Sequence, residues 1–295
     1  MTRKLLPVVL SVAIVGCGLL RKEPTGMDAG PTPSASTTVS APSGALAVGD
    51  RVVARWGSGS FYEGTVESVG ARHVIKWGDG SKASEVEPSD VMPIPKAGSD
   101  PQVVVGDFVF ARFGSNAWPG AQVTSVAPGA IGVKYASDGT AATVTPEKIL
   151  KAPPAVAPEI QKQLAQTEFL NKAKASGRPR APATYKAKVG DTVVAEWITQ
   201  SWFSGKVKTI KADKATVEWA DGSRPTEVAV DKLVPAPDPV KAKAPKAGQF
   251  VLARPESGNR WSYAQVTQVD GTRVQIKLPD GKTRTVAPVD CIGLE

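Results

Sequence analysis

The sequence predicts an all-β protein built from four small antiparallel barrels arranged in two pairs. Three observations lead to this fold class. A unit of about fifty residues occurs four times, each copy contains short apolar runs that alternate with polar residues, and each copy carries an Asp-Gly step between two such runs. The 28 glycines and 25 prolines among 295 residues also favour short strands joined by turns over one continuous core.

The spacing of the four copies predicts the pairing. The opening glycines lie at Gly49, Gly106, Gly190 and Gly248, so the copies are separated by 57, 84 and 58 residues. Two close pairs are therefore joined by a longer connection. The predicted barrels cover 46–95, 103–152, 187–236 and 247–295.

Within each copy the residue pattern predicts five short strands. Val52, Ala54 and Trp56 occupy every second position, as expected for one face of a strand. The Asp-Gly step, Asp79-Gly80 in the first copy, predicts a hairpin with a type I′ turn, in which both central residues have positive φ. Five strands in about fifty residues can close into a barrel, which removes the open edges of a flat sheet.

The segments between the barrels are predicted to be linkers with one helix. Residues 153–186 join the two pairs and include good helix formers at about 158–175, with Ile160, Leu164 and Leu170 roughly on one stripe. Gly177 and Pro179 would end this helix. Residues 237–246 form a shorter linker between the last two copies.

The N-terminus is predicted to direct export. Arg3 and Lys4 precede an apolar run that is too short to span a bilayer, which is typical of a signal peptide over residues 1–16. The following "IVGC" resembles a bacterial lipobox, which implies lipid attachment at Cys17; a plain secretory signal is the alternative. Residues 17–45 are rich in Pro, Ser, Thr and Ala and are expected to form a disordered tether. These features predict a lipid-anchored protein of the bacterial cell envelope, with the outer membrane slightly favoured because Gly18 follows the cysteine.

The repeats resemble a known family of small barrels. "VGDRVVARWGSGSFYEGTV", followed by "VIKWGDGS", is similar to the Tudor domain, whose wider group includes Agenet and PWWP modules. The resemblance covers all four copies, roughly two thirds of the chain, and the second copy contains "AWPGAQV", which is closer to the PWWP pattern. It implies a module in which rings at the barrel mouth form a cage for methylated lysine or arginine.

Carried onto this sequence, the resemblance implies aromatic pockets in the odd-numbered barrels. The first barrel would use Trp56, Tyr62 and Trp77, with Asp79 at the rim. The third would use Trp197, Phe203 and Trp219, with Asp221 at the rim. The second barrel has a partial set, Phe113 and Tyr135, with Pro119 in place of one wall, and the fourth has none. The alternative interpretation is that these rings only cover the barrel ends and pack against a neighbouring repeat.

The sequence therefore favours a non-enzymatic module that binds a protein or an envelope polymer, with the acyl chains holding it to the membrane. The net charge of +8 and the lysines at 206, 208, 211 and 214 leave binding of nucleic acid or another polyanion through basic barrel surfaces as an alternative, although export argues against nucleic acid. A purely structural spacer is the other alternative.

Catalysis is not expected, because no nucleophile motif, phosphate loop or metal-ligand spacing is present. One histidine excludes a His-rich metal site, and no cofactor is predicted. Cys291 aligns with core positions of the other copies and is expected to be buried. Neither the ligand nor the oligomeric state follows from the sequence.

Overall fold

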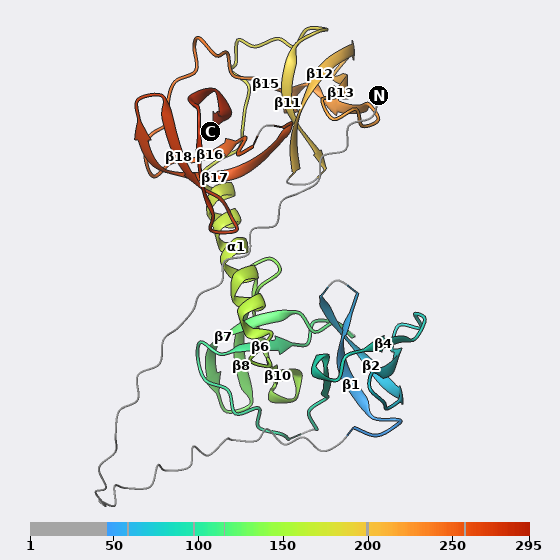
Figure 1. Ribbon diagram of the computed structural model, residues 1–295. Helices are drawn as coiled ribbons and strands as arrows, with labels where there is room; N and C mark the ends of the chain where they lie inside the picture. The colour runs from blue at the N-terminus through green and yellow to red at the C-terminus, as the bar shows by residue number, and fades with distance from the viewer. Residues whose placement is uncertain (1–45, 58, 97, 115, 199–200, 257) are drawn as a thin grey trace, which may run out of the picture. The chain divides into compact units, whose positions relative to one another are not determined.

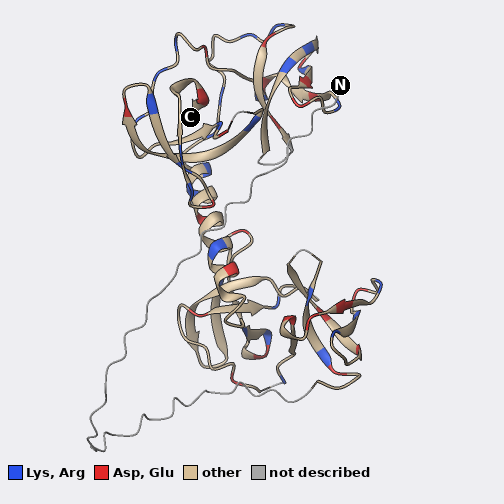
Figure 2. Cartoon of the chain, in the orientation of Figure 1, with Lys and Arg blue, Asp and Glu red and all other residues tan. Residues whose placement is uncertain are grey.

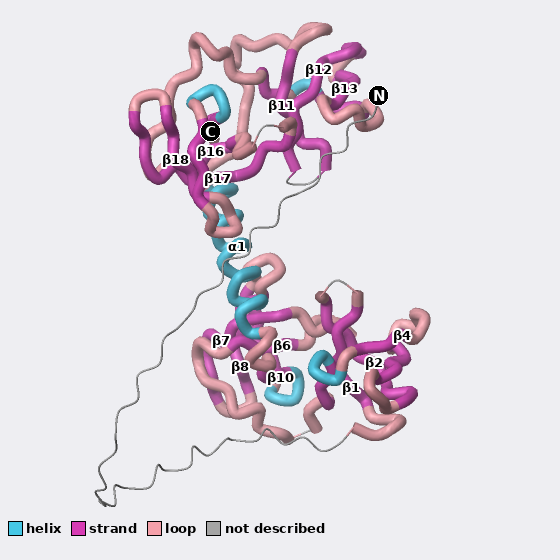
Figure 3. The backbone as a smooth tube through the Cα atoms, in the orientation of Figure 1, coloured by secondary structure: helices cyan, strands magenta, loops and turns pink. Residues whose placement is uncertain are grey.

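The computed structural model describes residues 46–295, apart from positions 58, 97, 115, 199–200 and 257 (Figure 1). This part of the chain forms twenty strands, one α-helix and four single turns of 3-10 helix, and Figure 3 shows the strands as the dominant element. The predicted all-β fold class is confirmed. The predicted signal peptide, the lipid site Cys17 and the tether lie outside the described residues.

The first barrel is a five-stranded antiparallel sheet with the order β4-β3-β2-β1-β5. Its strands are β1 (Arg51–Trp56), β2 (Ser60–Ser68), β3 (His73–Trp77), β4 (Ser84–Val86) and β5 (Val91–Pro93). The pairing of β2 with β3 shifts register between Val66 and Ser68, and the same irregularity recurs in the other three barrels. A β-bulge bends a strand and increases its twist, which allows the long second strand to serve both halves of a curled sheet.

The second barrel repeats this arrangement with the order β10-β6-β7-β8-β9. Its strands are β6 (Phe108–Ala111), β7 (Gly120–Ala127), β8 (Ala130–Tyr135), β9 (Ala141–Val144) and β10 (Ile149–Lys151). It joins the first barrel through backbone hydrogen bonds: the Glu63 N–H donates to Asn116 O at 2.9 Å, and the Trp118 N–H donates to Phe61 O at 2.9 Å. The chain just before β7 thus pairs with the start of β2.

The third and fourth barrels share one ten-stranded sheet. The third contains β11 (Thr192–Ile198), β12 (Ser201–Lys211), β13 (Lys214–Trp219), β14 (Thr226–Ala229) and β15 (Val234–Pro235). The fourth contains β16 (Phe250–Ala253), β17 (Arg260–Asp270), β18 (Arg273–Lys277), β19 (Thr283–Val286) and β20 (Cys291–Gly293). Strand β12 pairs with β17, which places Trp202 opposite Trp261. The junction is therefore equivalent to the one in the first pair.

The single α-helix, α1 (Ala157–Ala175), lies where the helix-forming residues predicted one. Its first half packs on the first barrel pair, since Ile160 and Leu164 belong to the same buried cluster as Phe110 and Trp118. The Thr167 hydroxyl donates to the Ala136 carbonyl at 2.7 Å. Within the described residues, no helix has the length and apolar character needed to cross a membrane.

The Asp-Gly steps form turns of a different kind from the predicted one. Only the glycine takes positive φ, as at Gly80 (φ 82°), and the loop from β3 to β4 is longer than a two-residue hairpin. The aspartate instead accepts a backbone N–H two residues ahead, from Ser81 to Asp79 Oδ1 at 2.9 Å. The same bond recurs at Asp138, Asp221 and Asp280. This local bond replaces the second positive φ that a type I′ turn requires.

These turns predict a loss of stability in acid. The backbone N–H donor holds the pKa of Asp79 and of its three counterparts below the usual value of 3.8. A carboxylate with a depressed pKa in the folded state stabilises the fold above its unfolded pKa, and that contribution is lost as pH falls through the folded value. We expect the midpoint temperature of thermal unfolding to decrease when the pH is lowered below about 4. Replacing all four aspartates by asparagine should reduce that acid-dependent drop, whereas an unchanged drop would contradict this origin.

Candidate functional site

The first barrel brings its four predicted site residues around one small cavity. Trp56 ends β1, Tyr62 lies in β2, Trp77 ends β3 and Asp79 lies in the turn that follows. Together with Glu63 and Asn116, these residues line a cavity of about 100 Å³. Glu63 and Asn116 were not predicted; Asn116 belongs to the second barrel and reaches the cavity because its carbonyl pairs with the start of β2.

The rings of this cavity differ in how deeply they are buried and in what holds them in place. Trp77 is 3% exposed and its indole N–H donates to Ser84 Oγ at 3.1 Å, so its position is fixed from behind. Trp56 is 46% exposed and meets Tyr62 edge to face, with ring centroids 5.9 Å apart and planes at 88°. The cavity therefore has a buried aromatic wall on one side and an exposed aromatic wall on the other.

Two carboxylates border the cavity, but only one is open. Glu63 is buried and accepts hydrogen bonds from Trp118 Nε1 at 3.0 Å and from Arg51 at 2.8 Å, while Arg112 Nε lies 2.9 Å from the same carboxylate. Its charge is thus balanced by the protein itself. Asp79 is exposed, and its pKa is lowered mainly by the Ser81 backbone N–H, so it is ionised at neutral pH. It supplies the uncompensated negative charge at the rim.

The third barrel also brings its three predicted rings together, in closer contact. The centroid of the Trp197 ring lies 5.5 Å from that of Phe203 and 5.7 Å from that of Trp219. Phe203 and Trp219 are separated by 6.4 Å, and the Trp219 N–H donates to Thr226 Oγ1. Trp197 and Phe203 pack against the hydrophobic core of the barrel. Asp221 borders a different cavity, between the third and fourth barrels.

The partial set of the second barrel has two rings in contact. Phe113 is 60% exposed, and its centroid lies 5.4 Å from that of the buried Tyr135. The Tyr135 hydroxyl donates to the Arg112 carbonyl at 3.3 Å, which fixes the buried ring. The exposed Phe113 ring is an apolar contact surface beside the first barrel and not the wall of a closed cage.

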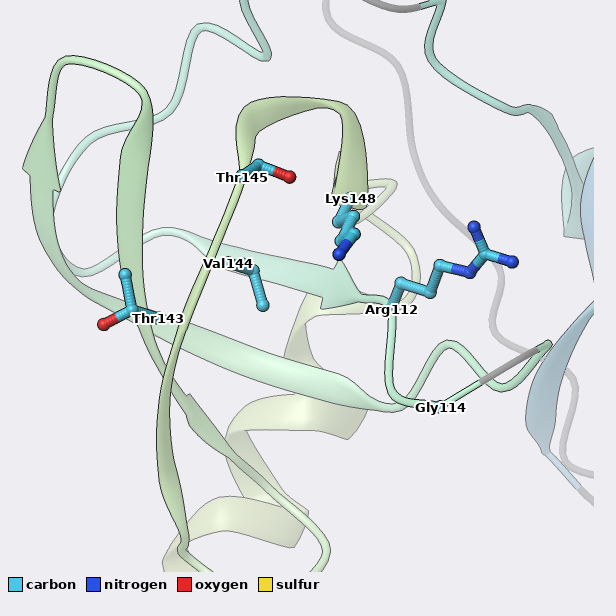
Figure 4. A pocket seen from close by; sticks show the side chains of 6 residues that line it. All are labelled: Arg112, Gly114, Thr143, Val144, Thr145 and Lys148. Carbon is cyan, nitrogen blue, oxygen red and sulfur yellow. The ribbon is translucent and has the colours of Figure 1, made fainter.

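A basic hollow of about 430 Å³ in the second barrel is lined by Arg112, Gly114, Thr143, Val144, Thr145 and Lys148. Figure 4 shows Lys148 pointing into the space beside Val144, with Thr143, Val144 and Thr145 along one side, whereas the Arg112 side chain extends away from these residues. Glu63 already holds Arg112, and the Thr145 hydroxyl donates to the neighbouring Glu147 carboxylate. The positive charge that an anion would need in this hollow is therefore partly balanced by the protein's own carboxylates.

The lysines that favoured polyanion binding are also partly neutralised. Lys208 lies 3.7 Å from Glu218, and Lys214 lies 3.4 Å from Glu227. Figure 2 shows both signs of charge distributed over the barrels. Cys291 is buried as predicted, and desolvation raises the pKa of its thiol to about 12, so it is not a reactive thiolate.

In the described part of the chain, no group of three or more His, Cys, Asp or Glu side chains is arranged to hold a metal ion.

Solved Agenet, MBT and Tudor structures are similar to parts of this chain at low sequence identity. No protein-family model matches the chain. No curated protein matches it either. Among solved structures, the AGD34 segment of AGDP1 from Arabidopsis thaliana is 18% identical over 42% of this chain and 87% of that one, with a TM-score of 0.27. The four MBT repeats of Drosophila melanogaster Sfmbt are 11% identical over 84% and 88%, with a TM-score of 0.16. The extended Tudor domain TD3 of mouse TDRD1 is 15% identical over 65% and 96%, with a TM-score of 0.22.

Proposed function

We propose that the chain is a non-enzymatic binding protein whose first barrel receives the cationic end of a partner's side chain, best a methylated ammonium. The observation that carries this proposal is the cavity between Trp56, Tyr62 and Trp77 with the open carboxylate of Asp79 at its rim. Pockets for whole small molecules span about 300–1,000 Å³. A cavity of about 100 Å³ is suited to the tip of one side chain.

The chemistry of the cavity matches such a tip. A methylated ammonium is attracted to aromatic faces by the ring quadrupole, at about 0.5–2 kcal/mol for each good contact. Methylation also makes the cation less costly to remove from water than a plain ammonium, which is strongly hydrated. The Asp79 carboxylate adds charge attraction without closing the mouth. In the third barrel the Trp197 ring also contacts Trp219, with centroids 5.7 Å apart, so we propose it as the weaker of the two sites.

We further propose that Cys17 carries acyl chains and holds these barrels at the bacterial cell envelope, with a protein or an envelope polymer as partner. Several acyl chains give stable anchoring where a single chain does not. Weak contacts from linked barrels would add through effective concentration. Mass analysis of the protein isolated from membranes tests the anchor: an acylated Cys17 is expected, and an unmodified N-terminus would overturn it.

The binding site is tested by titrating the full chain with a trimethyllysine peptide and the same peptide with unmodified lysine. We expect the trimethyllysine peptide to bind more tightly, and Trp56→Ala to weaken binding by about tenfold or more, since the exposed aromatic wall is lost. Asp79→Asn should weaken it by about three- to tenfold at low salt and less at high salt. Isothermal calorimetry measures both effects.

Phe113→Ala is the matched control. It removes an exposed aromatic ring from the same barrel pair, but this ring does not line the aromatic cavity. It should leave the affinity within about twofold of the parent. Equal losses for Trp56→Ala and Phe113→Ala would indicate a general apolar surface. No binding by any peptide would leave the structural spacer as the remaining role.

A further inference from the structure

We propose that the mouth of the second barrel is a separate site for a large uncharged apolar side chain of a peptide, such as phenylalanine or leucine. A groove of about 510 Å³ opens there, within the range of about 300–1,000 Å³ typical of ligand pockets. The inference rests on the proposed function only for the class of ligand, a peptide. The groove, and the side chain that it selects, differ from those of the aromatic cavity.

The groove occupies the same place in the second barrel as the aromatic cavity does in the first. The register of β7 with β8 matches that of β2 with β3, so the two repeats align position by position along these strands. Phe113 and Pro119 therefore fall at the positions of Trp56 and Tyr62, and both of them line the groove. Pro119 places no large ring in this mouth, and the groove measures about 510 Å³ against about 100 Å³ for the aromatic cavity. The second mouth thus admits a bulkier group.

One added residue removes the negative charge from the rim of this groove. In the first barrel Asp79 stands two residues after Trp77. In the second barrel Ser137 is added before the turn, so Asp138 stands three residues after Tyr135. Ser137 lines the groove and Asp138 does not. The second mouth therefore carries a neutral hydroxyl where the first carries an open carboxylate, and it lacks the charge that would attract a cation.

The two charged side chains that border the groove are bound to each other. Arg55 Nη1 lies 3.2 Å from the Glu159 carboxylate, and Arg55 Nε lies 3.1 Å from Asp90. The guanidinium also lies over the Phe61 ring, 4.9 Å from its centroid. An anionic ligand would meet a guanidinium that two carboxylates already hold, and a cationic ligand would compete with Arg55 for Glu159. A neutral ligand avoids both costs.

The inner wall of the groove is apolar and comes from both barrels and from α1. Phe61, Phe110 and Ile160 belong to one buried cluster, and all three border the groove. Gly120 allows α1 to approach β7, since a Cβ at this position would lie 2.7 Å from the Ile160 side chain; Figure 1 shows the start of α1 beside β6 and β7. Phe113, which is 60% exposed, forms the outer side. An apolar side chain can stack on Phe113 and face this wall, whereas the hydroxyls of a sugar would lack partners there.

The test titrates the isotope-labelled full chain with the peptide Ac-Gly-Gly-Phe-Gly-Gly-amide, followed by NMR at the Gly120 amide and the Gln163 side-chain amide, which border the groove. We expect saturable shifts at both reporters at millimolar peptide. Peptides with lysine or alanine in place of phenylalanine should bind at least about fivefold more weakly, because lysine finds no open carboxylate and alanine buries little apolar surface. Equal binding of the lysine peptide would overturn the proposal, as would shifts produced by N-acetylglucosamine and not by the phenylalanine peptide.

Phe113→Ala is the decisive variant, because it removes the exposed side of the groove and leaves the buried cluster intact. It should weaken binding of the phenylalanine peptide by about fivefold or more. Phe113→Tyr keeps the ring and should bind within about twofold of the parent. Ser137→Asp restores a rim carboxylate and should bring the affinities for the lysine and phenylalanine peptides closer together. Equal binding by Phe113→Ala and the parent would exclude the groove as the site.

Trp56→Ala and Phe113→Ala together separate this site from the aromatic cavity. Trp56→Ala should leave the shifts at Gly120 and Gln163 unchanged even if the first barrel proves not to bind trimethyllysine. A trimethyllysine peptide whose other residues are all glycine should in turn bind Phe113→Ala like the parent. Loss of the phenylalanine-peptide shifts in Trp56→Ala would assign that peptide to the first barrel and contradict the proposal. Failure of the trimethyllysine peptide alone would remove only the proposed function.

Discussion

Replacing Trp118 by alanine is expected to lower the free energy of unfolding of the first barrel pair by about 3–5 kcal/mol. Trp118 is 1% exposed and belongs to one buried cluster with Phe61, Phe110 and Ile160, which come from both barrels and from α1. Its removal leaves a large cavity at the junction and takes the indole N–H away from Glu63. Urea unfolding, combined with hydrogen exchange at β1 and β7, measures the loss in that pair.

Trp56→Ala is the control for this prediction. Trp56 is also a tryptophan of the first pair, but nearly half of it is exposed, so its truncation should cost about 1 kcal/mol or less. Exchange rates in β16 and β17 should stay at parent values in both variants. A cost below about 1 kcal/mol for Trp118→Ala would mean that the two barrels do not depend on a shared core.

The barrels could be predicted from the sequence because each one is specified by local patterns. The alternation predicts that Val52 and Ala54 face the core of the first barrel, and both are fully buried there; Val53 between them is also buried, because its face packs at the junction with the second barrel. Four copies of the pattern reinforce each other, so a weak signal in one copy is supported by the rest. The Asp-Gly step located the turn correctly, but not its type, because the aspartate side chain forms a bond that the dipeptide alone does not reveal.

The junctions could not be predicted in the same way. They depend on backbone groups at Phe61, Asn116 and Ala117, and hydrogen-bonding backbone carries no residue signature. A signal for them was nevertheless present: Trp118 and Trp261 recur around the start of the second strand of the even-numbered copies, opposite Phe61 and Trp202 of the odd-numbered ones. The sequence around Trp118 resembles the PWWP pattern, whereas in the structure Trp118 packs between the two barrels of the first pair.

The candidate site shows the same division between local and non-local information. The three rings of the first and third copies follow strand positions, and the structure brings each set together. Whether a cavity stays open between them depends on neighbours from the adjoining barrel, such as Asn116, and on how far the side chain at the junction reaches. Spacing along one repeat does not contain that information.

Replacing Glu63 by alanine is expected to cost about 2–4 kcal/mol of unfolding free energy in the first pair. Hydrogen bonds to a charged group contribute about 1.5–3 kcal/mol each, and the loss leaves the buried Trp118 indole N–H without its acceptor. The ion pairs add less than their short distances suggest, because Arg51 and Arg112 are partly exposed and water can replace the carboxylate. Chemical denaturation of the variant measures the total.

Glu63→Gln distinguishes the shape of this side chain from its charge. Glutamine keeps an oxygen that can accept the indole N–H, so it should cost about half as much as alanine if that bond dominates. A cost equal to that of alanine would instead assign the effect to the two arginines. The double-mutant cycle of Glu63→Ala with Trp118→Phe then isolates the coupling between the carboxylate and the indole N–H, which we expect to be about 1 kcal/mol or more. Because Glu63 also borders the aromatic cavity, both variants should weaken trimethyllysine binding, and the loss should be smaller for glutamine, whose side chain preserves the cavity wall.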